Sequence, residues 1–162
     1  MKGLLDISVF GRFFQRPQKK SLLVALLGDV VDHEVVDLAL SVSKKNSLEI
    51  VLVHAVEIPR DLPLDADLPD ERKSGWEYVR QVEALLKNNR CKIEYTGLVM
   101  ARDAGVAIVK EASVRDVGSI FVGLPYKYRQ GTFALGTAVP NILKNANCEV
   151  VVVRQKIPNK NA

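Results

Sequence analysis

Short apolar runs alternate with segments of helical period along most of the chain. The apolar runs predict five strands, at Ser21–Leu27, Leu48–Val56, Lys92–Val99, Ser119–Gly123 and Cys148–Val153. Between them, apolar residues recur three and four positions apart, which predicts four amphipathic helices. The first is expected to bury Val35, Leu38, Ala39 and Val42, and the second Trp76, Val79, Val82 and Leu86.

Polar residues stand where three of these helices are expected to begin. Asp32 is placed to cap the first helix, Asp103 to start the third, and Thr137 to cap the fourth. Pro140 falls in the first turn of the fourth helix, where a missing N–H costs little. The stretch 57–71 holds three prolines and an acidic cluster, and is expected to be a loop.

Some of the predicted strands are near-continuous apolar runs, such as Ile50-Val51-Leu52-Val53 and Val150-Val151-Val152-Val153. Such runs indicate burial on both faces of a sheet. Strands that alternate with helices require right-handed crossovers and therefore a parallel sheet. The pattern predicts a single doubly wound α/β domain, with a five-stranded parallel sheet and helices on both faces.

Length and composition agree with one ordinary globular domain. The chain has 162 residues, of which 48% are hydrophobic and 26% charged. It contains no apolar run long enough to span a bilayer and no recognisable secretory signal. Cys91 and Cys148 lie far apart without a CxxC pattern, and are expected to be packing residues in a reducing compartment. We therefore expect a cytoplasmic protein.

The net charge of +4 is concentrated at the two ends of the chain. Residues 1–20 hold five basic side chains against one acidic one, and residues 154–162 add three more, which leaves −3 for the body. A nucleic-acid-binding domain would gather its cations on a folded face, so no nucleic acid is expected as a partner. We divide the chain into a basic amphipathic extension (1–20), the domain (21–155) and a short polar tail (156–162).

Catalytic signatures are absent from the sequence. It has no GxSxG elbow, phosphate-binding lysine loop, GxGxxG or HExxH. His33 and His54 are interpreted as structural or surface residues. The acidic loop residues are interpreted as solvated rather than as metal ligands; they are Asp61, Asp65, Asp67, Asp70 and Glu71. No catalytic or metal-binding residue is therefore assigned, and the protein is not expected to be an enzyme.

The segment from Gly123 to Ala138 carries the most specific chemistry. A glycine leaves a strand, a basic polar loop follows, and Gly136-Thr137 opens a helix. Helix N-termini present unpaired N–H groups that suit phosphate. Lys127 and Arg129 can add positive charge. A plain strand–loop–helix turn with a glycine cap would have a similar sequence.

From about Ser21 to Arg154 the chain resembles the universal stress protein family. The resemblance rests on Leu22–Asp29, Val36–Leu40, Val51–Val56, the Arg102-Asp103 turn and Ala146–Arg154. In nucleotide-binding members of that family, the loop after the fourth strand has Gly, two residues, Gly, nine residues, Gly, then Ser or Thr. Gly123, Gly136 and Thr137 match this spacing.

Two positions depart from the family pattern. Tyr126 stands at the middle glycine, where its ring can stack on a base or close the site. Leu27 stands before Gly28, where those members usually carry an Asp that can bind adenosine. The candidate nucleotide-binding residues are Leu27, Gly28, Ala55, Val56, Val99, Met100, Gly123, Tyr126, Lys127, Arg129, Gly136, Thr137 and Ala138.

The resemblance implies a regulatory or ligand-sensing domain, acting in stress response, with an altered nucleotide-binding loop. One alternative is a working binder of ATP, AMP or cyclic AMP; the sequence alone assigns no cofactor. Another is an accessory domain that docks on a membrane transporter. The resemblance also implies a homodimer through the last strand. The extension 1–20 predicts either a helix lying on a membrane surface or one packed on protein.

Overall fold

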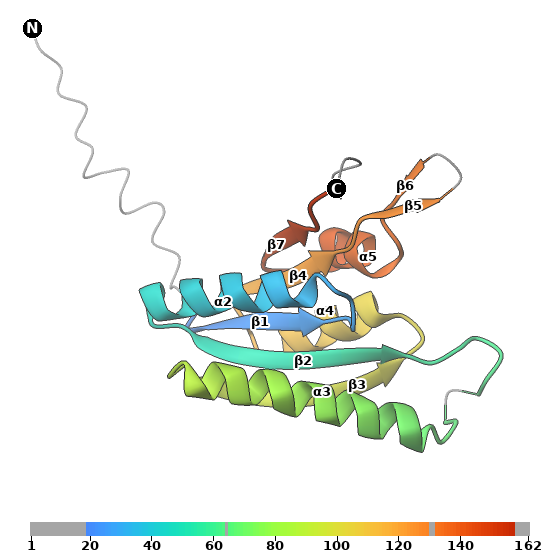
Figure 1. The fold of residues 1–162 in the computed structure, drawn as a ribbon, viewed down its shortest axis with the longest axis horizontal. Helices are drawn as coiled ribbons and strands as arrows, with labels where there is room; N and C mark the ends of the chain where they lie inside the picture. Colours follow the sequence, from blue (N-terminus) through green and yellow to red (C-terminus); the bar gives the residue numbers. More distant parts are fainter. Residues whose placement is uncertain (1–18, 64, 130–131, 158–162) are drawn as a thin grey trace, which may run out of the picture.

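The structure is a computed structural model that describes residues 19–63, 65–129 and 132–157. Five parallel strands form one sheet in the order β3-β2-β1-β4-β7 (Figure 1). The strands are β1 (Ser21–Leu26), β2 (Glu49–Glu57), β3 (Ile93–Ala101), β4 (Ser119–Leu124) and β7 (Glu149–Arg154). The helices between them are α2 (Asp32–Asn46), α3 (Pro69–Asn88), α4 (Ala104–Val114) and α5 (Ala138–Asn145). The predicted doubly wound fold is confirmed.

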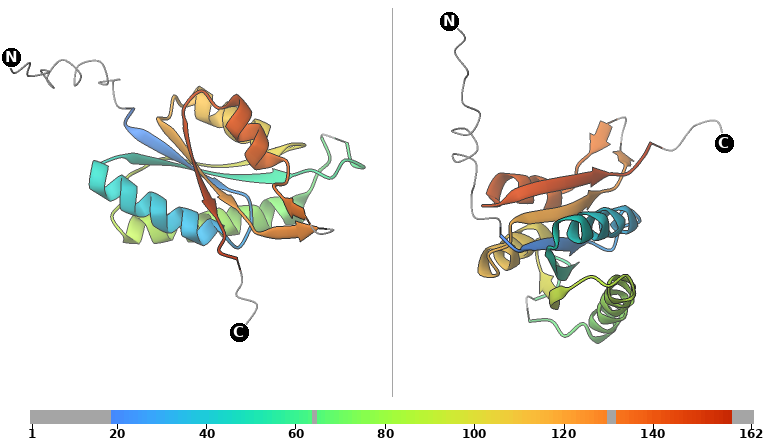
Figure 2. Two further views of the ribbon diagram at one scale, coloured as in Figure 1. Left: turned by 90° about the horizontal axis from the view of Figure 1, so that it is seen from above. Right: turned by 90° about the vertical axis from the view of Figure 1, so that its left-hand side faces the viewer.

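The central strand β1 is buried along its whole length and divides the interior into two cores. Leu22, Val24 and Leu26 pack beneath α2 and α3, while Leu23 and Ala25 face α4 and α5. Alternate residues of a strand point to opposite faces, so a strand covered on both sides must be apolar at every position. This requirement explains the uninterrupted apolar run of β1. Figure 2 shows the two helical layers, with α2 and α3 on one face of the sheet and α4 and α5 on the other.

The order of the strands places a ligand crevice beside β1. The chain builds β1, β2 and β3 outward in one direction, then crosses back to place β4 next to β1 and β7 beyond it. The winding therefore reverses between β1 and β4. In such sheets the loops that follow these two strands diverge and leave an opening at their carboxyl ends.

The start of α2 differs from the prediction. Asp32 is the first helical residue rather than its cap, and the capping position, Val31, makes no side-chain hydrogen bond. Leu38 is 39% exposed, whereas Val36 is buried. The helix packs against both β1 and β4, and this rotates Val36 rather than Leu38 toward the sheet.

Other helix starts follow the sequence more closely. The Asp103 carboxylate accepts the N–H of Val106 at 3.1 Å and caps α4 as predicted. The helix α3 begins at Pro69, so Asp70 and Glu71 belong to its first turn and not to the acidic loop. Pro69 suits the first turn of a helix, where its missing N–H is not needed. The carboxylates of Asp70 and Glu71 interact favourably with the positive end of the helix dipole.

The segment after β4 contains a small hairpin where a polar loop was predicted. Strands β5 (Lys127–Arg129) and β6 (Thr132–Ala134) pair antiparallel. The rings of Tyr126 and Phe133 stack beside them, with centroids 5.5 Å apart. Aromatic contacts across a strand pair stabilise two-stranded ribbons. The sequence run contains these residues, but it is too short to show strand periodicity.

Most of the predicted extension 1–20 and most of the tail 156–162 lie outside the described residues. A membrane-surface or packing role for the extension therefore stays a prediction. Within the described part of the chain, no helix is long and apolar enough to cross a membrane. The last strand, β7, lies at an edge of the sheet.

Candidate functional site

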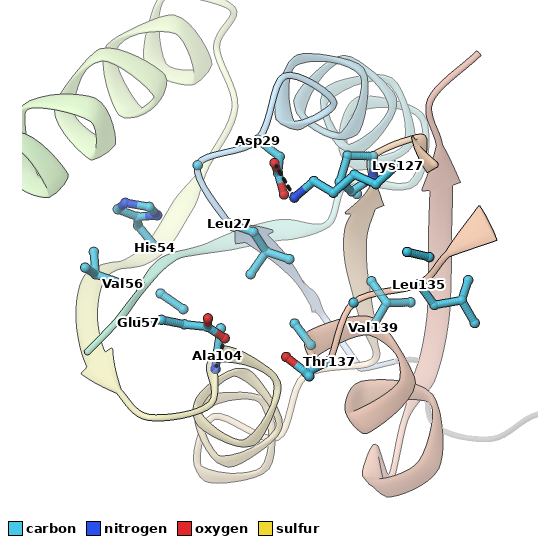
Figure 3. A pocket seen from close by; sticks show the side chains of 17 residues that line it. Leu27, Asp29, His54, Val56, Glu57, Ala104, Lys127, Leu135, Thr137 and Val139 are labelled. Carbon is cyan, nitrogen blue, oxygen red and sulfur yellow. Dashed lines mark hydrogen bonds and ion pairs between the residues drawn. The ribbon is translucent and has the colours of Figure 1, made fainter. Parts of the chain in front are cut away.

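A cavity of about 480 Å³ opens at the carboxyl ends of β1, β2 and β4, where the winding reverses (Figure 3). Its volume lies in the ~300–1,000 Å³ range of small-molecule pockets. The walls come from the turn after β1, the end of β2, the start of α4 and the segment between β4 and α5. The lining residues are Leu27, Gly28, Asp29, His54, Ala55, Val56, Glu57, Ala104, Gly123, Pro125, Lys127, Ala134, Leu135, Gly136, Thr137, Ala138 and Val139.

The turn after β1 forms one wall and is held by a buried carboxylate. Gly28 has φ of +75°, a conformation that residues with a Cβ adopt at a cost. Asp32 reaches back and accepts the N–H of Gly28 at 2.9 Å and the N–H of Leu27 at 3.1 Å. The Asp32 side chain thus satisfies the backbone of the turn instead of capping its own helix.

Asp32 is fully buried and has a third donor. The hydroxyl of Tyr78, on α3, donates to Asp32 Oδ2 at 3.0 Å. Desolvation raises the pKa of Asp32 above its ordinary value, although the three hydrogen bonds partly offset this. Burial beside that carboxylate also raises the pKa of Tyr78. The pair therefore joins the cavity wall to α3, which packs against β2 and β3.

His54 supports the same wall from β2. Its Nδ1 lies 2.9 Å from the carbonyl oxygen of Leu26. A carbonyl oxygen only accepts, so Nδ1 carries the proton. The ring also meets Tyr78 edge to face, with centroids 5.3 Å apart. His54 has the structural role expected from the sequence and, in addition, lines the cavity.

The opposite wall is the turn that leads into α5. Gly136 has φ of +68°, and a Cβ built on it would meet nothing within 4 Å. Thr137 occupies the N-terminal capping position, but its side chain makes no capping hydrogen bond. Because Pro140 has no N–H, the free donors of the first turn are the backbone N–H groups of Ala138 and Val139. An anion in the cavity can accept hydrogen bonds from them.

Charged side chains lie around the mouth of the cavity. Asp29 Oδ1 and Lys127 Nζ form an ion pair at 3.4 Å, which joins the β1 turn to the start of β5 (Figure 3). Glu57, at the end of β2, accepts the backbone N–H of Ala104 at 3.2 Å. Two carboxylates and one ammonium group are therefore among the described lining side chains.

The structure brings nine of the thirteen candidate residues into the lining of this cavity. They are Leu27, Gly28, Ala55, Val56, Gly123, Lys127, Gly136, Thr137 and Ala138. They come from four separate stretches of sequence that meet because β1, β2 and β4 are adjacent.

The other four candidates are not among the described lining residues. Val99 and Met100 are on β3, paired with Ala55 and Val56, one strand further from the opening. The ring of Tyr126 stacks on that of Phe133, and its backbone N–H donates a hydrogen bond to Gln155 Oε1 at 3.0 Å. Arg129 belongs to β5, and its side chain is outside the described part of the structure.

Gly123, which lines the cavity, also has a packing role that the sequence pattern did not indicate. A Cβ at this position would lie 2.4 Å from Cγ1 of Val31. Real Cβ contacts are never this short, so the glycine permits the start of α2 to pack against β4. Helix packing therefore requires a glycine here whether or not a ligand approaches its backbone.

Sequence reasoning missed eight lining residues. They are Asp29, His54, Glu57, Ala104, Pro125, Ala134, Leu135 and Val139. The position of Asp29 and Glu57 at the carboxyl ends of two predicted strands was an available signal, because such ends gather at one edge of a parallel sheet. Ala134 and Leu135 depend on the hairpin and had no such signal. Among the described residues, no three His, Cys, Asp or Glu side chains gather to hold a metal ion.

Comparison with known proteins places the fold. The sequence model of the universal stress protein family matches residues 19–154. No curated protein sequence matches the chain significantly.

Solved structures share the fold at low sequence identity. A universal stress protein from Archaeoglobus fulgidus has a TM-score of 0.67 and 16% identity, over 82% of this chain and 96% of that one. A universal stress protein from the same organism, solved in complex with dAMP, has a TM-score of 0.61 and 14% identity, over 82% and 95% of the two chains. A universal stress protein in complex with cAMP has a TM-score of 0.62 and 17% identity, over 85% and 99%. Since the family model covers most of the sequence, this chain belongs to the universal stress protein family.

Proposed function

We propose that the protein is a ligand-sensing regulatory domain that binds an adenine nucleotide or nucleoside in the cavity between the β1 and β4 loops. The observation that carries this proposal is the arrangement of the two opposing turns. Each contains a glycine at positive φ, and one opens a helix whose first N–H groups are free for an anion. Structures of two universal stress proteins in complex with dAMP and cAMP support a mononucleotide as ligand.

The lining supports binding rather than catalysis. His54 Nδ1 is committed to Leu26, and the Glu57 carboxylate is committed to the N–H of Ala104. Asp29 is paired with Lys127. A general base needs a side chain poised to take a proton from the reacting group, whereas these groups hold the walls of the cavity. We therefore propose a non-catalytic role in stress response, within the cytoplasm.

Leu27 lowers the affinity that such a cavity can reach. It directly follows β1, lines the cavity and packs against the core on the α4–α5 side. Its side chain cannot accept hydrogen bonds from a ribose or a base. Recognition in this proposal rests on backbone groups near Ala55 and Val56 and on the phosphate site, which favours weak, reversible binding suited to sensing.

The test combines retained ligand with a matched pair of variants. Mass spectrometry of small molecules released from freshly purified protein is expected to find an adenine compound, and calorimetry is expected to give saturable binding of AMP or cAMP. Thr137→Val removes a hydroxyl that makes no capping bond, so it should weaken nucleotide binding and leave the fold intact. Thr96→Val, on β3 outside the cavity lining, is the control. Absence of binding by wild type to every adenine compound would contradict the proposal.

We also propose that the protein is a homodimer formed through β7. This strand lies at the edge of the sheet, with one side paired to β4. Its four valines are only partly buried. An edge strand with unpaired backbone groups and apolar side chains can be completed by a second copy of itself.

A further inference from the structure

We propose that Asp29 makes the cavity select ligands with few phosphates, so that adenosine and AMP bind better than ATP. This inference rests on the proposed function and names the class of ligand. It comes from the ion pair between Asp29 and Lys127 and from the second carboxylate on the cavity wall, Glu57.

The ion pair joins two walls that a ligand must lie between. Asp29 follows Gly28 in the turn after β1, and Lys127 begins β5. Oδ1 and Nζ are 3.4 Å apart, and the side chains are 28% and 53% exposed. The pair is therefore accessible from the cavity mouth (Figure 3). A contact of this length and exposure is weak enough for a ligand to replace.

A phosphate at the α5 turn would compete with Asp29 for the same ammonium group. Lys127, Gly136 and Thr137 line one cavity, so a phosphate held by the backbone N–H groups of that turn is within the same compartment as Nζ. When Lys127 turns to the phosphate, Asp29 loses its partner and faces the anion. Asp29 thus reduces the gain that Lys127 can provide.

The second and third phosphates of a nucleotide are also repelled by the carboxylates of the cavity wall. Glu57 lies on the wall at the end of β2, and its carboxylate is held by the N–H of Ala104. Each added phosphate brings negative charge toward Asp29 and Glu57, and repulsion between like charges is strengthened where the cavity excludes water. A nucleoside has no such penalty, whereas a monophosphate can be offset by Lys127, the one ammonium group among the described lining side chains.

Calorimetric titrations with adenosine, AMP and ATP in metal-free buffer test this selectivity. Wild type is expected to bind AMP at least about threefold more tightly than ATP, with the gap narrowing at high salt. Asp29→Asn frees Lys127 and removes a carboxylate, so AMP affinity should rise about two- to fivefold while adenosine affinity stays constant. Lys127→Gln should lower AMP affinity. In a protein that carries Lys127→Gln, the further change Asp29→Asn should raise AMP affinity less than it does in wild type. Asp37→Asn, an equal change of charge on the exposed side of α2, is the control.

The outcomes separate this inference from the proposed function. ATP binding as tight as AMP binding in wild type, or equal AMP affinities of Asp29→Asn and Asp37→Asn, would overturn the inference while nucleotide binding stands. If no adenine compound binds, the proposed function fails, and titration with inorganic pyrophosphate decides the role of Asp29. Tighter pyrophosphate binding by Asp29→Asn than by Asp37→Asn supports it; equal binding, or none by either variant, overturns it.

Discussion

The hydroxyl of Tyr78 donates a hydrogen bond to the buried carboxylate of Asp32 across 46 residues of sequence. Asp32 in turn accepts the backbone N–H groups of Leu27 and Gly28. A position on α3, outside the cavity lining, thereby supports the turn that forms the cavity wall.

Tyr78→Phe should destabilise the fold by about 1.5–3 kcal/mol, because a hydrogen bond to a charged group is lost in a partly buried site. Chemical denaturation measures the change. Tyr95→Phe is the matched control, since the Tyr95 ring, which packs under Arg115, remains in place. Equal stabilities of the two variants would contradict the role of the Tyr78 hydroxyl.

Asp32 should make the stability of the protein depend on pH. Its pKa is raised in the folded state by burial, above the ordinary value of 3.8. The contribution of Asp32 to the free energy of unfolding is therefore fully present below the pKa of the unfolded state. It is lost as the pH rises through the raised pKa of the folded state. The free energy of unfolding of wild type should fall relative to that of Asp32→Asn over this window. A constant difference between the two proteins across the window would show that the pKa is not raised.

Leu27→Asp should strengthen adenosine binding about ten- to a hundredfold, because the new carboxylate can accept hydrogen bonds from the ligand. Calorimetry with adenosine avoids the repulsion that a phosphate would add. Leu27→Ala opens similar space without a carboxylate and is the control. If the two variants bind adenosine equally, the gain comes from space and not from the carboxylate.

Dimerisation through β7 depends on the backbone groups that face away from β4. Glu149 and Gln155 donate their N–H groups toward the β4 side, to Gly118 and Leu124. By alternation, Val151 also points inward, so Val151→Pro would break the sheet of the monomer itself. The N–H of Val152 points to the open edge.

Val152→Pro is therefore expected to give a folded monomer, since proline is tolerated on an edge whose N–H faces outward. Val152→Thr keeps the N–H and should remain dimeric. Light scattering over a range of concentrations distinguishes them. A wild type that stays monomeric at high concentration would rule out the dimer.

Gly123→Ala should destabilise the protein by about 1–3 kcal/mol, because the added methyl group overlaps Val31 at 2.4 Å. Val31→Ala in the same chain should recover part of this loss. Gly118→Ala, whose methyl group would meet the Lys19 side chain at 3.1 Å, should cost less. Equal costs of the two alanine variants, without recovery by Val31→Ala, would contradict this packing role.

Local periodicity was sufficient to predict the main elements. The strands of the sheet are within one or two residues of their predicted bounds. The strands β1, β2 and β4 are marked by apolar runs because helices cover both of their faces. Asp103 was predicted correctly because a cap acts within a single helical turn. The hairpin of β5 and β6 was not predicted, because three-residue strands are too short to show a period.

The sequence by itself determined the five strands of the sheet, the four helices, their order along the chain and the spacing of Gly123, Gly136 and Thr137, since these depend on residues near one another in the chain. Only the tertiary structure decided that β1 lies beside β4, that Asp29 reaches Lys127 and that Asp32 reaches Tyr78 rather than its own helix. Those contacts join residues far apart in sequence. Their formation depends on how the two helical layers pack on the sheet, and no local pattern records that packing.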